Sequence, residues 1–323
     1  MRLVRDQNWN TTLDQCPFAF FGLPFSKTGD DYYGAVFAAG LASHSFGFAD
    51  DAGLCAVIKC DNSDRERLTR YKFPIEIWAA DRLGAPACNE LISHILGELS
   101  TLSRSQGMTG YTIRTWGESC FVRMLAGRLL AGGTVPILAL DAVLDLANDD
   151  ATLFALMRSG HRRHVRWGEK SLSLLFVDQD NPDKALFESY QQLHAEIAGR
   201  VTRPQASWDA MFALIAGGKG DLAISHFEGN MIGGTLVLDD GQAAYYASGA
   251  NRRDQFDKPL AHFPLYKLAT RARARGNHHF VVGEVGQFEA AASDKERSIG
   301  QFKSGFSSET RASLIWTVAV APV

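Results

Sequence analysis

Positively charged side chains gather in one short stretch of the chain at a spacing that suits a helix. Arg158, Arg162, Arg166 and Lys170 follow one another at intervals of four residues, and they belong to five basic residues within thirteen positions. Residues four apart lie along one stripe of a helix. Such a stripe can follow a nucleic-acid backbone through phosphate contacts. The alternative is a solvated helix face, which is the commoner use of a charge run.

Three other kinds of chemical site find no support in the residue patterns. His278 and His279, like His161 and His164, lack a third ligand at a suitable spacing, so no metal site is predicted. The glycine-rich stretch 217–220 lacks the spacing and the following Ser/Thr of a P-loop, and it is typical of a helix stop. No Gly-x-Ser-x-Gly elbow is present to carry a serine nucleophile.

The composition limits the class of protein. A chain of 323 residues with 46% hydrophobic residues is typical of a globular protein with two cores. The net charge of −3 excludes a surface that attracts nucleic acid all over, so any RNA contact needs a local basic patch. The five cysteines lack the spacing of a disulfide framework and favour free thiols in a reducing compartment. Because neither a signal peptide nor an apolar run of about 20 residues is present, we expect a cytoplasmic protein.

Apolar runs and turns in the first half predict alternating strands and helices. The turn at 50–53 separates two apolar runs and predicts a β-hairpin. Pro74 favours a position at the edge of a sheet for the run that contains it. The predicted elements are strands at 41–48, 54–60, 73–78, 111–115 and 135–140, and helices at 91–99 and 121–130.

The second half repeats this order of elements. A helix is expected to open at Leu153 and run into the basic stretch, and Ser207 is expected to cap a helix that ends at Gly217. Three strands separated by short turns predict an antiparallel meander. Further elements are strands at 172–177, 222–227, 231–238, 243–248, 279–282 and 314–320, and helices at 185–197 and 260–274. The repeated order favours an α+β fold produced by duplication, with a boundary near residues 148–150; the alternative is two unrelated α/β domains of similar content.

Four short motifs stand in the same order as in a known enzyme family. They are the basic stretch 158–170, Arg203-Pro204 ahead of the helix bearing Trp208, the aromatic strand 245–249, and Gln301-Phe302-Lys303-Ser304-Gly305-Phe306. Over residues 144–306 this order resembles the Fem family of peptidoglycan aminoacyltransferases, whose domains have the GNAT acyltransferase fold. The resemblance implies two tandem GNAT-like domains, each a mixed, mainly antiparallel sheet flanked by helices. Their expected ranges are 1–147, joined by 314–323, and 148–313.

The resemblance also assigns roles to single residues. Lys303 and Phe302 are the catalytic candidates: Lys303 matches a lysine that stabilises the reaction's oxyanion or holds the donor, and the ring of Phe302 is expected to pack against the donor. Arg203 matches an arginine that contacts the phosphate-bearing part of the acceptor, with an ordinary surface ion pair as the alternative. Trp208 is placed with it as a substrate-binding candidate. Tyr246 is expected to bind substrate or relay a proton, with a ring buried in the core as the alternative.

Two departures from the family and fold patterns bear on the substrates. Val281 and Val282 stand where the family usually carries an acidic residue, which leaves the identity of donor or acceptor open. Coenzyme A-using members of this fold class cradle a pyrophosphate on backbone N–H groups of a glycine-rich turn. The corresponding turn here, 251–259, contains no glycine. That absence favours aminoacyl-tRNA over acyl-CoA as the donor.

We therefore expect an enzyme of the aminoacyltransferase type, with no bound cofactor. It would move an amino acid from aminoacyl-tRNA to an amine of a cell-wall precursor or a related small acceptor, and the basic stripe would contact the donor RNA. One alternative is an acyl-CoA-dependent N-acyltransferase that acts on an amino sugar or another amine. The other is a non-catalytic protein that binds RNA or a nucleotide-sugar.

Overall fold

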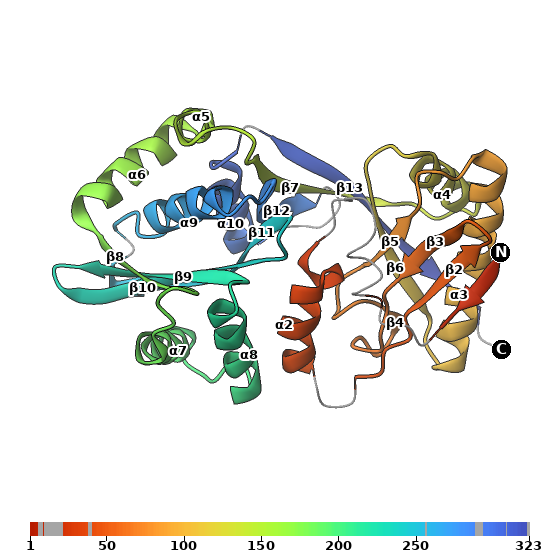
Figure 1. Cartoon of the computed structure of the whole chain (residues 1–323), viewed down its shortest axis with the longest axis horizontal. Coiled ribbons are helices and arrows are strands. Elements are labelled where there is room, and N and C mark those ends of the chain that lie inside the picture. Colours follow the sequence, from red (N-terminus) through yellow and green to blue (C-terminus); the bar gives the residue numbers. More distant parts are fainter. Residues whose placement is uncertain are drawn as a thin grey trace. The chain divides into compact units, whose positions relative to one another are not determined.

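The computed structural model describes residues 1–5, 9, 22–37, 41–255, 257–287, 293–307 and 309–321. The chain forms two compact units (Figure 1). Unit 1 comprises Met1–Ala139, Gln287–Ala290 and Ala312–Val323, and unit 2 comprises Leu140–Gly286 and Ala291–Arg311. The domain ranges expected from the sequence, 1–147 with 314–323 and 148–313, stay a prediction.

The sheet of unit 1 is mainly antiparallel. Its strands lie in the order β1-β2-β3-β5-β6-β13. Only β5 and β6 run parallel on this path, while the short strand β4 (Arg67–Leu68) also pairs parallel with β6. The strand bounds are Arg2–Val4 (β1), Phe46–Asp50 (β2), Gly53–Ile58 (β3), Ile75–Ala79 (β5), Gly110–Trp116 (β6) and Thr310–Ala319 (β13). The hairpin predicted around residues 50–53 is confirmed as β2 and β3.

Two helices form the core of unit 1 together with this sheet. Helix α3 (Ala85–Ser105) leads from β5 to the parallel strand β6, and α4 (Cys120–Ala131) packs beside it. The apolar residues of α3 recur at helical spacing and therefore pack into the core, where Leu91, Ile92, Ile95 and Leu99 are buried and Leu96 is partly buried. The buried core includes Phe46, Ile58, Leu91, Ile95, Ile113, Leu125 and Trp316.

Pro74 does not mark a sheet edge. Strand β5 begins one residue later, at Ile75, and pairs with β3 on one side and β6 on the other. The missing N–H of proline costs no ladder hydrogen bond because the residue lies before the strand. The edge prediction was therefore wrong.

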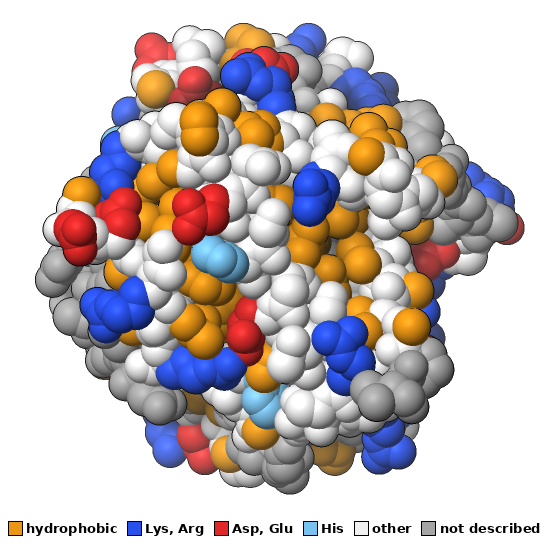
Figure 2. Space-filling view, turned by 90° about the vertical axis from the view of Figure 1, so that its right-hand side faces the viewer, with side chains coloured by type: hydrophobic (Ala, Val, Ile, Leu, Met, Phe, Trp, Pro, Cys, Tyr) orange, Lys and Arg blue, Asp and Glu red, His pale blue; other side chains and the backbone are white. Residues whose placement is uncertain are grey.

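Charges of both signs share the outer surface with apolar groups. On the face shown in Figure 2, Lys and Arg side chains alternate with Asp and Glu, and hydrophobic side chains lie exposed between them. Among the described residues of unit 1, Leu130 and Val135 are exposed large hydrophobic side chains. The four described cysteines, Cys55, Cys60, Cys88 and Cys120, are free thiols, and Cys16 lies outside the described residues.

The sheet of unit 2 has the strand order β7-β12-β11-β10-β9-β8. Strands β8 to β11 form an antiparallel series, which confirms the predicted meander, and β12 returns parallel to β11. The bounds are Ile137–Asp145 (β7), Ser173–Val177 (β8), Gly220–Phe227 (β9), Asn230–Asp239 (β10), Ala243–Asn251 (β11) and His279–Gln287 (β12).

Helices cover both faces of the unit 2 sheet. In Figure 1, α6 (Ser159–Ser171), α9 (His262–Ala274) and α10 (Asp294–Ser304) lie on one face, and α7 (Lys184–Ala198) and α8 (Gln205–Ala216) lie on the other. Helices α6 and α9 touch closely, because a Cβ at Gly168 would lie 2.3 Å from the Cβ of Phe263. Unit 2 also contains the short helix α5 (Asp150–Leu156) and the 3-10 turn Arg253–Gln255, and unit 1 contains helix α2 (Lys27–Phe37) and the 3-10 turn Leu23–Phe25.

Two predicted helix boundaries were wrong. The helix expected to run from Leu153 into the basic stretch is broken: α5 ends at Leu156, and Arg158 is the N-cap of α6. Ser207 does not cap α8; it is buried within it, and Pro204 holds the N-cap position. The helix stop at Gly217 is confirmed as the C-cap of α8.

The described helices include none that is long and apolar enough to span a membrane.

Candidate functional site

Strands β11 and β12 part from each other after three residue pairs. They pair parallel only over Ala243–Tyr245 and His279–Val281, although β11 continues to Asn251 and β12 to Gln287. The register of β10 with β11 shifts at this point, because Val237 faces Tyr246 while Leu236 faces Ser248. Ala247 is therefore the extra residue of a β-bulge, which bends its strand. The part of the sheet in which these two parallel strands continue without pairing to each other is here called the β11–β12 opening.

The amine of Lys303 lies against β12 beside this opening. Lys303 belongs to the last turn of α10, and its Nζ is 3.0 Å from the position that a Cβ at Gly283 would take. Gly283 follows Val281, the last paired residue of β12, by two positions. Its φ of +105° is a conformation that favours glycine. The strand thus provides a space without a side chain for the lysine amine.

The surroundings of Lys303 act on its charge in opposite directions. Burial lowers the pKa of the Lys303 amine, while the carboxylates of Asp141 on β7 and Glu284 on β12 act to raise it. Asp141 is buried. A cation held in a partly water-excluded place stabilises negative charge more strongly than one in bulk water. The arrangement can therefore stabilise an oxyanion that forms in the β11–β12 opening.

Two glycines let helix α10 pack closely against β12 and α6. A Cβ at Gly300 would lie 2.1 Å from the carbonyl oxygen of Val285, and one at Gly305 would lie 2.1 Å from the ring of His161. Any side chain at either position would push the helix away from its neighbour. These close approaches fix where the last turn of α10 carries Lys303.

Phe302 packs into the apolar interior of unit 2. Its ring centroid lies 5.1 Å from that of Phe306 and 5.1 Å from that of His262. The side chains of the Phe-Lys motif therefore lie in different surroundings: Phe302 packs among the helices, and Lys303 reaches β12.

Tyr246 stands on the other strand of the opening. It directly follows Tyr245, the last residue of β11 paired with β12. Its hydroxyl lies over Gly249, 2.2 Å from where a Cβ would be, and its ring packs against the unit 2 core. Burial raises the pKa of the Tyr246 hydroxyl. The structure thus places Tyr246 and Lys303 beside the same opening, on β11 and β12 respectively.

Arg203 and Trp208 lie on the α7–α8 face of the sheet. The guanidinium of Arg203 is 5.5 Å from the Trp208 ring centroid, and its Nη1 is 3.2 Å from the sulfur of Met211. Trp208 is only 3% exposed and packs against Tyr190. Tyr190 in turn donates a hydrogen bond to Ser248 of β11 over 3.1 Å. Trp208 has the surroundings of a core residue, and its role in substrate binding stays a prediction.

The basic side chains of the stretch 158–170 differ in their surroundings: one binds the backbone of α5, and others are exposed. Arg162 donates to the carbonyl oxygens of Ala155 and Met157, at the end of α5. Arg158, Arg166 and Lys170 are exposed; the first donates to Ser304 over 3.1 Å, and Arg166 lies 5.2 Å from the ring centroid of Phe154. The predicted RNA contact of the stripe stays a prediction.

Three histidines gather where α6, α9 and α10 meet. The ring centroid of His262 lies 4.6 Å from that of His161 and 4.6 Å from that of His164. Burial, with the nearby His161 and His164, lowers the pKa of His262 to about 3. The i, i+3 spacing of two histidines on α6 was visible in the sequence, but only the fold adds His262. No metal-binding group of His, Cys, Asp or Glu occurs among the described residues.

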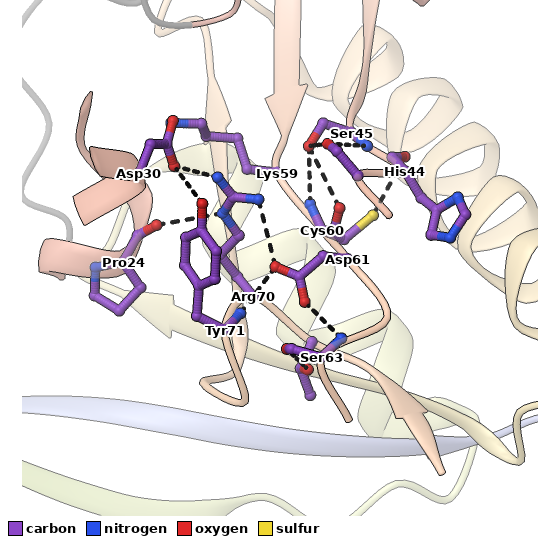
Figure 3. A network of polar contacts seen from close by, with 12 residues as sticks. Pro24, Asp30, His44, Ser45, Lys59, Cys60, Asp61, Ser63, Arg70 and Tyr71 are labelled. Carbon is purple, nitrogen blue, oxygen red and sulfur yellow. Dashed lines mark hydrogen bonds and ion pairs between the residues drawn. The ribbon is translucent and has the colours of Figure 1, made fainter. Parts of the chain in front are cut away.

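Unit 1 contains a buried ion network that sequence reasoning missed (Figure 3). The Nζ of Lys59 lies 2.7 Å from a carboxylate oxygen of Asp30, and Arg70 also donates to Asp30. Arg70 reaches Asp61 over 3.4 Å, and the Tyr71 backbone N–H donates to Asp61 over 2.9 Å. Two cations meet two carboxylates, so the formal charges cancel. The network ties α2 to β3 and to the turn at 70–73, which indicates a structural role.

The comparisons with known proteins establish the fold. No protein-family model and no curated protein matches the sequence. Among solved structures, the chain is similar to FemX, with a TM-score of 0.66 at 12% identity over 98% of each chain. It is also similar to a conserved protein of unknown function from Bacteroides thetaiotaomicron, with a TM-score of 0.56 at 9% identity over 94% of this chain and 100% of that one.

A third similar structure is a tandem GNAT protein from the clavulanic acid biosynthesis pathway. The TM-score is 0.50 at 15% identity, over 97% of this chain and 93% of that one. At such identities the similarity shows the fold. The predicted α+β fold of two tandem GNAT-like domains is confirmed, and so is the resemblance to the Fem proteins at the level of the fold.

Proposed function

We propose that this protein is an acyltransferase that joins an activated acyl group to an amine in the β11–β12 opening. One observation carries the proposal: the half-buried amine of Lys303 lies against Gly283, close to the point where β11 and β12 part. Tyr246 borders the same opening from β11. The acyltransferase fold shared with FemX and the tandem GNAT protein supports the reaction class.

The chemistry follows from the groups present. The acceptor amine attacks the carbonyl carbon of the donor ester, a C–N bond forms, and the carbonyl oxygen becomes an oxyanion. The Lys303 ammonium stabilises that oxyanion, which for one well-placed donor is worth about 3 kcal/mol. The C–O bond to the leaving group then breaks, and the proton lost by the amine passes to the leaving oxygen or to solvent.

For the donor we propose aminoacyl-tRNA. Arg158, Arg166 and Lys170 of α6 are exposed cations that suit an RNA backbone. The turn after β11 carries Arg252 and Arg253 in place of glycines, and Arg252 pairs with Glu196 over 2.9 Å. Such side chains leave little room for a pyrophosphate to approach the backbone. A donor of this kind also places the reaction in the cytoplasm.

Acyl-CoA is the alternative donor, and the β11–β12 opening itself favours it. Backbone N–H and C=O groups of two diverging parallel strands can pair with the amide groups of an extended pantetheine arm. In that case the acceptor would be an amino sugar or another small amine.

For the acceptor we propose an amine of a nucleotide-linked cell-wall precursor or a related small molecule. Arg203 would bind its phosphate groups, because a guanidinium fork binds phosphate at two points. A non-catalytic protein that binds RNA or a nucleotide-sugar would leave the Lys303 amine without a chemical role.

Thermal unfolding with candidate ligands tests the proposal. The probes are an aminoacyl-tRNA mixture, UDP-linked wall precursors and acetyl-CoA. A ligand at a hundredfold excess over its Kd adds about 2.7 kcal/mol of stability and raises Tm. A shift with tRNA or wall precursor but not with acetyl-CoA supports the aminoacyltransferase. A shift with acetyl-CoA alone overturns the proposed donor in favour of the acyl-CoA enzyme.

A further inference from the structure

The first turn of α6 holds the last turn of α10 through three hydrogen bonds. The Nε2–H of His161 donates to the carbonyl oxygen of Phe302 over 2.8 Å. The backbone N–H of Arg158 donates to the carbonyl oxygen of Gly305 over 2.9 Å, and its guanidinium donates to the Ser304 hydroxyl over 3.1 Å. All three acceptors lie within three residues of Lys303. The Phe302 carbonyl also accepts from the backbone N–H of Gly305 over 3.3 Å, and its second lone pair is available for the bond from His161.

The contact from His161 is made by a buried side chain, whereas the side chain of Arg158 is exposed. His161 is buried, its ring stands at 85° to the ring of Phe306 at 4.9 Å, and it fills the space that the missing side chain of Gly305 leaves. A carbonyl oxygen can only accept, so Nε2 carries the proton. Rotation of the ring away from this orientation would break the bond to Phe302.

We propose that His161 is a positioning residue for Lys303: it holds the carbonyl of Phe302 and thereby sets where the Lys303 amine meets β12. The proposal rests on the proposed function, in which that amine stabilises the oxyanion. From the other side, Gly300 and Gly283 let α10 lie directly on β12. The turn that bears Lys303 is therefore fixed between α6 and β12, as preorganised catalysis requires.

His164 provides a matched comparison on the same helix. It lies one turn after His161, packs against His262 at the same centroid distance of 4.6 Å, and places its Nδ1 3.3 Å from the Nε2 of His262. His164 contacts His262 and His161, whereas His161 also bonds to the backbone of α10. Loss of the ring at either position removes packing, but only loss of His161 removes the bond to Phe302.

The test compares His161→Phe, His161→Gln and His164→Phe in the full chain. Phenylalanine keeps a ring and removes the donor, whereas the glutamine amide nitrogen can occupy the place of Nε2. Labelling with a water-soluble amine-reactive ester, followed by peptide mass spectrometry, measures how reactive the Lys303 amine is at each pH. Steady-state transfer assays with aminoacyl-tRNA and with acetyl-CoA measure kcat and KM.

We expect His161→Phe to change the labelling rate of Lys303 by about two- to tenfold, the range that corresponds to one hydrogen bond. The labelling profile should move toward that of an ordinary lysine, and kcat should fall with little change in KM. His161→Gln should restore both, and His164→Phe should leave both near wild type. If His161→Phe shows no cooperative melting, Arg158→Ala replaces it, with a smaller change in the same direction.

Unchanged labelling in a folded His161→Phe variant would overturn the proposal, and so would an equal change in His164→Phe. If labelling changes as expected but neither His161→Phe nor Lys303→Ala slows transfer, the positioning of Lys303 stands and its proposed role in the reaction falls.

Discussion

The amine of Lys303 rests on Gly283, a residue of β12 with a φ of +105° that leaves 3.0 Å between Nζ and the position of a Cβ. The two residues belong to different elements, and they meet beside the point where β11 and β12 part. The lysine position thus depends on a glycine that the Phe-Lys motif does not contain.

Replacement of Gly283 tests this dependence. Gly283→Ala forces a side chain into a positive-φ position, which costs about 1–3 kcal/mol of stability, and displaces the lysine amine. We expect a lower kcat from this variant. Gly286→Ala is the control on the same strand, because nothing lies within 4 Å of the Cβ it would add. Equal kcat values for the two variants would contradict the account.

Alkaline pH should abolish activity through Lys303. Burial lowers the pKa of its amine, and only the protonated form stabilises an oxyanion. Activity should therefore fall as pH rises through this lowered pKa, below the pH at which an ordinary lysine loses its charge. Lys303→Arg keeps the charge to higher pH and should move the alkaline limb of the kcat profile upward. A limb that stays in place in Lys303→Arg would show that another group titrates.

Acid should destabilise unit 2 through the histidine cluster. Burial lowers the pKa of His262 to about 3 from an ordinary value of 6.5. Between these two pH values the imidazole is therefore protonated in the unfolded chain and neutral in the folded chain. Stability is full above pH 6.5 and falls as pH drops toward 3. Each unit by which the pH falls within this range lowers the free energy of unfolding by up to about 1.4 kcal/mol. Chemical denaturation at a series of pH values measures the slope.

His262→Phe is the matched variant for that experiment. Phenylalanine keeps an aromatic ring among Phe302, Phe306 and the remaining histidines but does not titrate. The loss of stability between pH 6.5 and 3 should become shallower in this variant. An unchanged slope would assign the acid sensitivity to other groups.

Removal of the Asp30 charge should lower the stability of unit 1. Lys59 and Arg70 both bind this carboxylate, and both cations are buried. Asp30→Asn leaves a buried excess of positive charge, and breaking a pair of this kind costs about 3–5 kcal/mol. Asp31→Asn, at the exposed neighbouring position, is the control. Denaturation midpoints that agree between the two variants would rule out the network as a source of stability.

Charge reversal on α6 should weaken RNA binding if aminoacyl-tRNA is the donor. Lys170→Glu removes one exposed cation, and each lost phosphate contact lowers the slope of log K against log salt by about 0.7–0.9. Arg128→Glu, at an exposed position of α4, is the control and should bind tRNA as the wild type does. Equal salt slopes for the two variants would place the RNA elsewhere.

The order of elements could be predicted from the sequence because apolar periodicity and turn residues carry it locally. The hairpin at 50–53 and the meander of β9 to β11 needed only neighbouring residues. The break between α5 and α6 could not be predicted in this way. Helical periodicity continues across it, and the chain turns where Arg162 binds the carbonyls of Ala155 and Met157.

The arrangement of the candidate site residues could not be predicted from local sequence patterns either. Phe302 and Lys303 are adjacent in a recognisable motif, but their side chains part: the Lys303 amine lies against Gly283, whereas the Phe302 ring packs against Phe306 and His262. The bulge at Ala247 depends on the register between β10 and β11, which no local pattern records. His262 joins His161 only when α9 packs on α6.

The most direct test of the account is single-turnover transfer of a labelled amino acid from aminoacyl-tRNA to an amine acceptor, by the wild type and by Lys303→Ala. We expect transfer by the wild type and a loss of about a hundredfold in the variant, because the variant lacks the oxyanion-stabilising group. Transfer at the same rate by a folded Lys303→Ala protein would contradict the central role given to this lysine.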